Sequence, residues 1–185
     1  MRLVFAAALA VLVVTSPARA QENGLELWAK IYSVFSHPRC ANCHVGADNI
    51  PRWSGKSYGG PRPHGMHVSA GDSRIGAELM PCGTCHGRRN SELPHGPPGA
   101  ETWLLPPVEM QWWEKSSGEI CAQIKDPARN GGRSLAQIAE HVGHDPLVLW
   151  GWAPGPGREP APFSGTEAAA FITRWDAAGA PCPAQ

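Results

Sequence analysis

The sequence predicts a mainly α-helical protein with long irregular loops, and three observations predict it. Helix-start signals recur in the last third of the chain. The 185 residues include 21 Gly and 19 Pro, which require many irregular connections. Two copies of a Cys-x-x-Cys-His string, at residues 40–44 and 82–86, stand in otherwise loop-like sequence.

The two Cys-x-x-Cys-His strings carry the strongest chemical signal. They read Cys40-Ala41-Asn42-Cys43-His44 and Cys82-Gly83-Thr84-Cys85-His86. This spacing is typical of covalent c-type haem attachment, because two thiols bond to the vinyl groups on one porphyrin edge and the following His binds the iron. The sequence therefore predicts a small dihaem cytochrome c fold built around two covalently attached c-type haems, with His44 and His86 as the proximal ligands.

Paired cysteines have two other common uses. Two Cys-x-x-Cys pairs can hold one structural zinc ion, and a single pair can be a redox dithiol. A zinc ribbon does not require the His that follows both pairs here, and no βαβ pattern surrounds either pair as in a thioredoxin-like protein. The duplicated His and the export signal described next favour haem.

Residues 1–20 predict a secretory signal peptide. Arg2 supplies the positive charge, residues 3–14 are apolar, and Ala18-Arg19-Ala20 is a small-residue cleavage site. An apolar stretch of this length is too short to span a bilayer. We therefore expect residues 21–185 to form a single soluble domain in the periplasm, where bacterial c-type haems are attached, without a transmembrane anchor.

Charge gives no indication of a nucleic-acid partner. Without Arg2 and Arg19, 14 of the 16 basic residues remain against 16 acidic ones, and no basic run exceeds Arg88-Arg89.

A chain this rich in loops buries little apolar surface by itself, so two porphyrins would supply the missing interior. The eight Trp residues fit packing against haem but would equally fit an ordinary core.

The first expected helix covers residues 22–35. Leu25, Trp28, Ala29, Tyr32 and Phe35 recur at helical spacing and predict one apolar face. Pro38 is expected to interrupt regular helix just before the first motif. Residues 47–81 and the Pro-rich residues 90–107 predict irregular loops, because no apolar period persists through them.

The helical C-terminal part is expected over residues 116–178. Helix starts are indicated at Ser116, Ser134 and Ser164, each followed three residues later by Glu or Gln, and the third helix is expected to end at Gly179. Between these helices, the apolar residues 147–152 form too short a run to assign and are expected to cover a haem face.

Cys121 and Cys182 remain once the haem thioethers are counted. Two such cysteines usually pair in an oxidising compartment, so we predict a disulfide between them; two free redox thiols are the alternative. In the chain-entropy model this bond would stabilise the fold by about 4–5 kcal/mol.

Spacing alone does not identify the sixth ligand of each iron. For the first haem the sequence favours His64, about 20 residues after His44 on a loop, followed by Met66 and His67. For the second it favours Met110 after a Pro-rich segment, with His144 and His141 as rivals. This choice predicts a low- and a high-potential haem in series, because a Met ligand raises the reduction potential. The remaining candidates are His95 and His37, which precedes Cys40 by three residues as in some stacked multihaem proteins.

The motifs also resemble those of a known group. Bacterial dihaem cytochromes often labelled isoquinoline 1-oxidoreductase subunits are similar to this chain over most of residues 21–185. The resemblance implies an electron-transfer partner, for example of a periplasmic molybdenum hydroxylase, and no catalytic subunit, since the chain has no molybdopterin or iron–sulfur motif. The similar segments are residues 37–44, 62–66, 80–86, 125–133 and 144–152.

Three functions from different classes follow from two haems. The first is a soluble periplasmic carrier that moves electrons from a dehydrogenase to a cytochrome or oxidase. The second is a dihaem peroxidase-like oxidoreductase with one open iron, for which His95, Glu109 and Arg88 are the available acid, base or charge-stabilising groups. The third is haem-based sensing, which also needs an open or displaceable sixth position. The abundance of His and Met favours the carrier.

Overall fold

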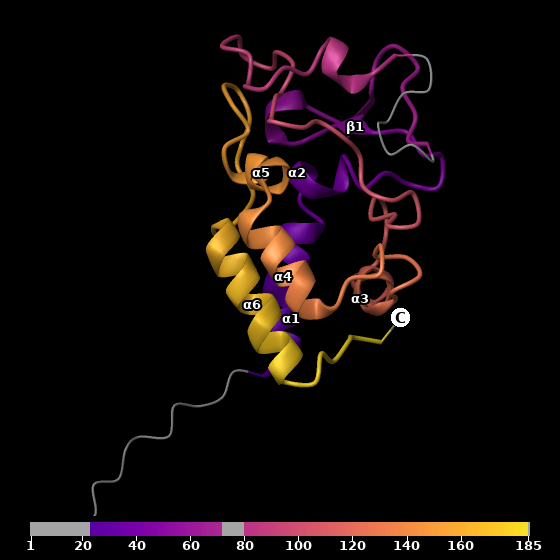
Figure 1. Ribbon diagram of the computed structural model, residues 1–185, viewed down its shortest axis with the longest axis vertical. Coiled ribbons are helices and arrows are strands. Elements are labelled where there is room, and N and C mark those ends of the chain that lie inside the picture. Colours follow the sequence, from indigo (N-terminus) through magenta and orange to yellow (C-terminus); the bar gives the residue numbers. More distant parts are fainter. Residues whose placement is uncertain (1–22, 72–79, 185) are drawn as a thin grey trace, which may run out of the picture.

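The computed structural model describes residues 23–71 and 80–184 (Figure 1). The predicted signal peptide at residues 1–20 lies outside the described residues. Helix accounts for 40% of the structure and strand for 3%, so the expectation of a mainly α-helical protein with long irregular loops is confirmed. No helix in the described part of the chain is long and apolar enough to cross a membrane.

Four helices gather at one end of the molecule, which we call the helical end (Figure 1). Each begins at a residue whose side chain accepts a hydrogen bond from a backbone N–H in the first turn, namely Asn23, Ser116, Ser134 and Ser164. The three serine starts were predicted, and Gly179 follows the last helix with a left-handed φ of 83°, as expected. The helices are α1 (Gly24–Phe35), α3 (Ser117–Lys125), α4 (Leu135–His144) and α6 (Gly165–Ala177).

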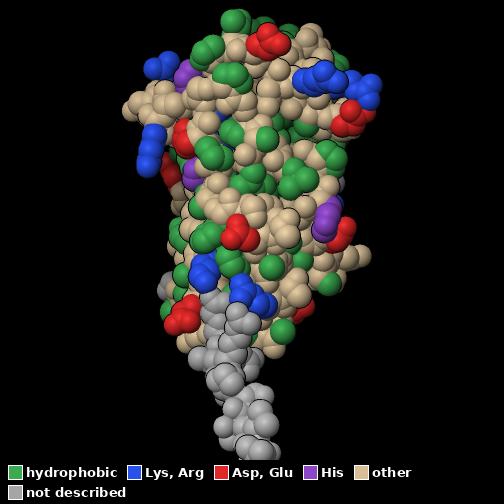
Figure 2. Space-filling model, turned by 90° about the vertical axis from the view of Figure 1, so that its left-hand side faces the viewer, with side chains coloured by type: hydrophobic (Ala, Val, Ile, Leu, Met, Phe, Trp, Pro, Cys, Tyr) green, Lys and Arg blue, Asp and Glu red, His purple; other side chains and the backbone are tan. Residues whose placement is uncertain are grey.

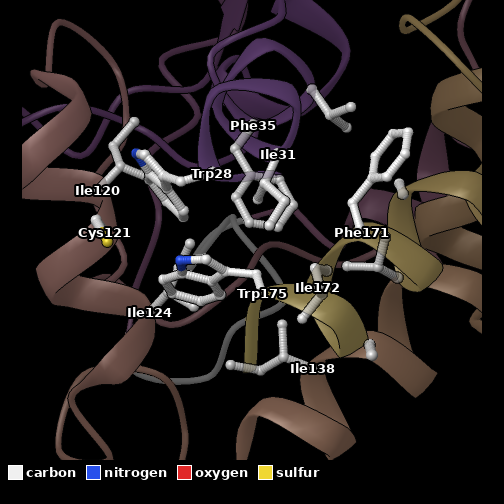
Figure 3. Close-up of a cluster of buried hydrophobic side chains, with 14 of the residues drawn as sticks. Trp28, Ile31, Phe35, Ile120, Cys121, Ile124, Ile138, Phe171, Ile172 and Trp175 are labelled. Carbon is white, nitrogen blue, oxygen red and sulfur yellow. The ribbon is translucent and has the colours of Figure 1, made fainter. Parts of the chain in front are cut away.

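The core of the helical end lies between α1, α3, α4 and α6 (Figure 3). Trp28 and Trp175 meet at its centre with ring centroids 5.0 Å apart. Each indole N–H has a partner, because Trp28 donates to Ser117 and Trp175 donates to the Pro181 carbonyl. Buried Trp and Ile side chains of this kind supply most of the stabilisation that a small core can give.

The predicted apolar face of α1 is partly wrong. Leu25 is 44% exposed, whereas Leu27, Ile31 and Val34 are buried together with Trp28 and Phe35. The face is rotated because α1 packs mainly against α6, and the Trp28–Trp175 contact sets its orientation. The predicted disulfide between Cys121 and Cys182 is present, with 5.7 Å between the Cα atoms, and it ties the C-terminal tail to α3.

The opposite end, which we call the loop end, consists of residues 43–71 and 80–105. Its regular structure is limited to β1 (Arg52–Trp53), β2 (Arg62–Pro63), and the 3-10 turns η1 (Lys56–Tyr58) and η2 (Cys82–Thr84). The two strands are antiparallel, with Arg52 opposite Pro63 and Trp53 opposite Arg62. Only Val45, Ala70 and Leu105 form a buried hydrophobic cluster among the described residues of this end.

Three short elements join the two ends: α2 (Pro38–Ala41), α5 (Pro146–Leu149) and the 3-10 turn η3 (Trp150–Trp152). Pro38 does not simply interrupt helix, as expected, but begins α2 at its first position, where a missing N–H costs nothing. The face in Figure 2 carries Lys and Arg interspersed with Asp and Glu and shows no single basic patch.

Candidate functional site

Both Cys-x-x-Cys-His motifs form one turn of helix with the same closing hydrogen bond. The His44 N–H donates to the Cys40 carbonyl at 3.1 Å, and the His86 N–H donates to the Cys82 carbonyl at 2.9 Å. The first motif continues α2, and the second forms η2 in a loop with no neighbouring helix. The same local geometry therefore appears in two very different surroundings.

The two motifs line two neighbouring cavities, and Cys43 of the first motif lines both. The loop-end cavity, of about 310 Å³, is lined by Cys82, Cys85 and His86 of the second motif. The central cavity, of about 330 Å³, is lined by Cys40, Cys43 and His44 of the first motif and by side chains of α1, α3 and α4. Both volumes lie in the range of cofactor sites, and both linings are mainly apolar.

The imidazole of His44 is fixed on two sides. Its Nδ1 lies 3.1 Å from the carbonyl oxygen of Met110. A carbonyl can only accept, so Nδ1 carries the ring proton and Nε2 carries the lone pair that a metal would use. The ring stacks on Trp112 with 3.5 Å between centroids and 4° between planes, and Trp112 in turn stacks on Phe35 of the core.

The imidazole of His86 is held in the same way by different residues. Its Nδ1 lies 2.8 Å from the Pro98 carbonyl, and its ring stacks on Trp103 with 4.5 Å between centroids and 4° between planes. Burial lowers the pKa of His86, although the Pro98 hydrogen bond acts in the opposite direction. The neutral ring is the form that binds a metal. A backbone carbonyl behind a ligating His is the usual device that orients such a ring.

The Pro-rich residues 90–107 and Met110 after them contact both motif histidines through the backbone. This segment was expected to present the Met110 thioether as a ligand of the second haem. The structure shows backbone carbonyls at both motif histidines, that of Pro98 at His86 and that of Met110 at His44. Met110 lines the central cavity with the first motif.

The cysteines do not have the properties of the two competing sites. Burial raises the pKa of Cys40 to about 12 and that of Cys43 to about 11, whereas a redox dithiol needs a lowered thiol pKa. Within residues 23–71 and 80–184, no three His, Cys, Asp or Glu side chains come together as metal ligands. A tetrathiolate zinc site would need all four motif cysteines around one ion.

Three candidate sixth ligands line the loop-end cavity: His64, Met66 and His95. The ring of His64 lies opposite His86, with 5.9 Å between centroids. His64 was expected to serve the first motif, but the turn between β1 and β2 brings it to the second instead. Met66 is 70% exposed. His95 packs edge-on against Tyr58, and its buried Nδ1 has no hydrogen-bond partner among the described residues.

In the central cavity the candidate is His141 on the last turn of α4. Its Nδ1 lies 3.1 Å from the Asp145 carboxylate, which orients the ring as carboxylates orient metal-binding histidines. Asp145 also caps α5 through the Leu147 N–H, so its position is fixed. The two side chains that the sequence favoured as sixth ligands are thus exchanged in space: His64 lies beside the second motif and Met110 beside the first.

The remaining candidates line neither cavity. His37 caps α2, because its Nδ1 accepts the Arg39 N–H, and burial lowers its pKa. His144 pairs with Glu140 on the surface, and His67 is exposed. Of the groups considered for an enzyme, Arg88 pairs with Glu101 on the surface and Glu109 is exposed, so only His95 lies in a cavity.

Nothing in the sequence indicated the residues that separate the two cavities. Arg39, Cys43, Trp103 and Trp150 line both cavities, and the Trp103 and Trp150 rings meet edge to face at 5.4 Å. The apolar residues 147–152 were expected to cover a haem face, and four of them line the central cavity: Leu147, Val148, Trp150 and Trp152. The high number of Trp residues indicated aromatic packing near the motifs. Sequence could not identify Trp103 and Trp112 as the indoles that stack on His86 and His44, because neither stands at a characteristic spacing from its motif.

These residues fit a c-type haem at each motif: two thiols on one turn, an oriented imidazole, an apolar cavity and a second imidazole. The sequence paired His44 with His64 and His86 with Met110, whereas the positions in the structure favour His86 with His64 and His44 with His141. Comparison of the chain with known protein families, with curated proteins and with solved structures found no match. Membership of the group of dihaem cytochromes labelled isoquinoline 1-oxidoreductase subunits therefore stays a prediction from the motifs.

Proposed function

We propose that this protein is a soluble periplasmic dihaem c-type cytochrome that carries electrons between redox protein partners. The observation that carries the proposal is the repeated site: two separate cavities, each with one Cys-x-x-Cys-His turn and a proximal imidazole oriented by a carbonyl and a Trp. Haem iron, when bound, supplies a one-electron couple between its ferric and ferrous states. The chain's own residues fix the imidazoles, exclude water and separate the two cavities.

The arrangement favours transfer between the two sites. Four residues line both cavities, so only one layer of side chains separates them. Two of these residues, Trp103 and Trp150, are aromatic, and Trp103 also contacts His86. The donor would be a periplasmic molybdenum hydroxylase or another dehydrogenase, and the acceptor a cytochrome or an oxidase.

A dihaem peroxidase-like oxidoreductase is the second candidate, favoured by one observation. The buried Nδ1 of His95 has no partner among the described residues and lies in the loop-end cavity, where it could move a proton. This function needs an open iron in that cavity, whereas the distance of 5.9 Å between the His64 and His86 ring centroids supports a filled sixth position.

Optical spectroscopy of the haem-loaded protein separates the two functions. A carrier with His64 and His141 as sixth ligands should show two low-spin haems that do not react with carbon monoxide, cyanide or peroxide. A high-spin haem that reacts with peroxide would instead support the enzyme. The mutation His95→Ala is the control, because it should abolish peroxide reactivity in an enzyme and leave a carrier's spectrum unchanged.

A further inference from the structure

Arg39 occupies an unusual position between the two cavities. Only 5% of the residue is exposed, and its side chain lines both cavities. The backbone holds it firmly, because Arg39 lies in α2 and its N–H donates to the His37 imidazole. Its guanidinium lies 5.9 Å from the ring centroids of both Tyr58 and Trp150.

The charge of this guanidinium is only partly compensated. Nη2 donates to the Ser54 carbonyl and lies 3.8 Å from a Glu159 carboxylate oxygen, at the outer limit of an ion pair. That same Glu159 carboxylate also accepts hydrogen bonds from the Lys56 N–H and the Ser57 hydroxyl. The buried Nε of Arg39 has no partner within the described chain. A buried cation with an unused donor is costly unless an anion completes it.

We propose that Arg39 is a cation shared by both haem sites: its Nε–H donates to a haem carboxylate at the common wall, and its charge raises the reduction potential of both irons. This inference rests on the proposed function. A guanidinium is suited to the role because it stays protonated and matches carboxylate geometry. A fixed positive charge in a site of low dielectric disfavours the ferric state, which carries one more positive charge than the ferrous state.

Two other arginines provide matched controls. Arg158 lines the loop-end cavity but not the central one, and Arg133 lines the central cavity but not the loop-end one. Replacement of each arginine by Met removes one charge and keeps a long apolar side chain. If position decides the effect, Arg158→Met and Arg133→Met should each lower one midpoint potential, and Arg39→Met should lower both.

The experiment is an optical redox titration of the haem-loaded wild type and these three variants. For Arg39→Met we expect both reduction equilibria to shift toward the ferric state by up to about tenfold, which is about 59 mV for a one-electron couple. A shift in one midpoint alone, or in neither, would overturn the inference. Wild-type protein without haem would contradict the proposed function instead, so the two failures are distinguishable.

A second variant decides the question if Arg39→Met does not fold. Glu159 lies nearer the surface, and Glu159→Gln removes the carboxylate that partly compensates Arg39. Both midpoints should then rise, and Glu159→Gln with unchanged midpoints, or with only one raised, would contradict the proposal. The ferric spectra should match that of the wild type in each variant, which excludes a change of axial ligand as the cause.

Discussion

The helical end and the loop end differ in how much buried apolar surface holds each of them together. One cluster of nineteen buried residues, most of them in α1, α3, α4 and α6, forms the core of the helical end, and the Cys121–Cys182 disulfide ties the C-terminal tail to it. At the loop end, three buried hydrophobic residues form the cluster, and the second motif lies in irregular chain around a cavity. The difference teaches that the first motif is built on a protein core, whereas the second has only a small core, which a haem would complete under the proposed function.

The largest effect is expected when haem attachment is removed at one motif at a time. Cys82→Ala with Cys85→Ala should abolish attachment at the second motif and lower the protection of residues 80–105 from hydrogen exchange, because the loop end then keeps only its small buried cluster. The helical end should keep its protection. Mass spectrometry after exchange resolves the two ends within one sample.

The reciprocal variant is the control for that experiment. Cys40→Ala with Cys43→Ala should remove the haem of the central cavity while α1, α3, α4 and α6 stay protected, since their cluster includes Trp28, Ile31 and Trp175. Loss of protection throughout the helical end in this variant would show that both ends depend on haem equally.

The corrected face of α1 gives the next largest effect. Ile31→Ala should lower the free energy of unfolding by about 2–5 kcal/mol, because the side chain is 1% exposed and its removal leaves a cavity. Leu25→Ala on the same helix should change it by less than about 0.5 kcal/mol, because Leu25 is 44% exposed. Denaturant unfolding measures both, and equal effects would contradict the packing of α1.

Replacement of each proposed sixth ligand should have a smaller effect, a change of spin state at one haem only. His64→Ala should make only the loop-end haem high-spin and able to bind carbon monoxide, so about half of the low-spin signal is lost. His141→Ala should do the same to the central haem. His144→Ala, next to Asp145 but outside the cavity, is the control. A Met-to-iron charge-transfer band that disappears in Met110→Ala would restore Met110 as a ligand.

The smallest effect concerns pH in the haem-free chain. Burial lowers the pKa of His86 below the usual 6.5, so the unfolded chain takes up this proton more readily than the folded one. The stability of the loop end should therefore be present above about pH 6.5 and decline as the pH falls below it. NMR should detect loss of the native Trp103 indole signal before that of Trp175, and His86→Gln should reduce the difference.

Local signals predicted the helical end better than the loop end. The capping residues Ser116, Ser134 and Ser164 act within one turn, so sequence shows them directly. The Cys121–Cys182 pairing followed from elimination in the expected compartment. The apolar face of α1 was misplaced because its partner, α6, lies more than a hundred residues away and sequence does not show how the two helices meet.

The candidate sites were predictable from sequence at the two motifs and not beyond them. The turn that joins Cys40 to His44 is local, but the carbonyl behind His44 comes from Met110, 66 residues later. The exchange of His64 and Met110 between the cavities has the same origin, since only tertiary folding decides which loop covers which motif. Arg39 gave no signal because its importance comes from lying between two cavities.

The central claim is that porphyrin is bonded to both motifs, and intact-protein mass spectrometry tests it most directly. Protein secreted by a host able to attach c-type haem should have the mass of the processed chain plus two haems, with each cysteine-pair variant losing one. A mass equal to that of the bare chain, or of the chain with zinc, would contradict the account.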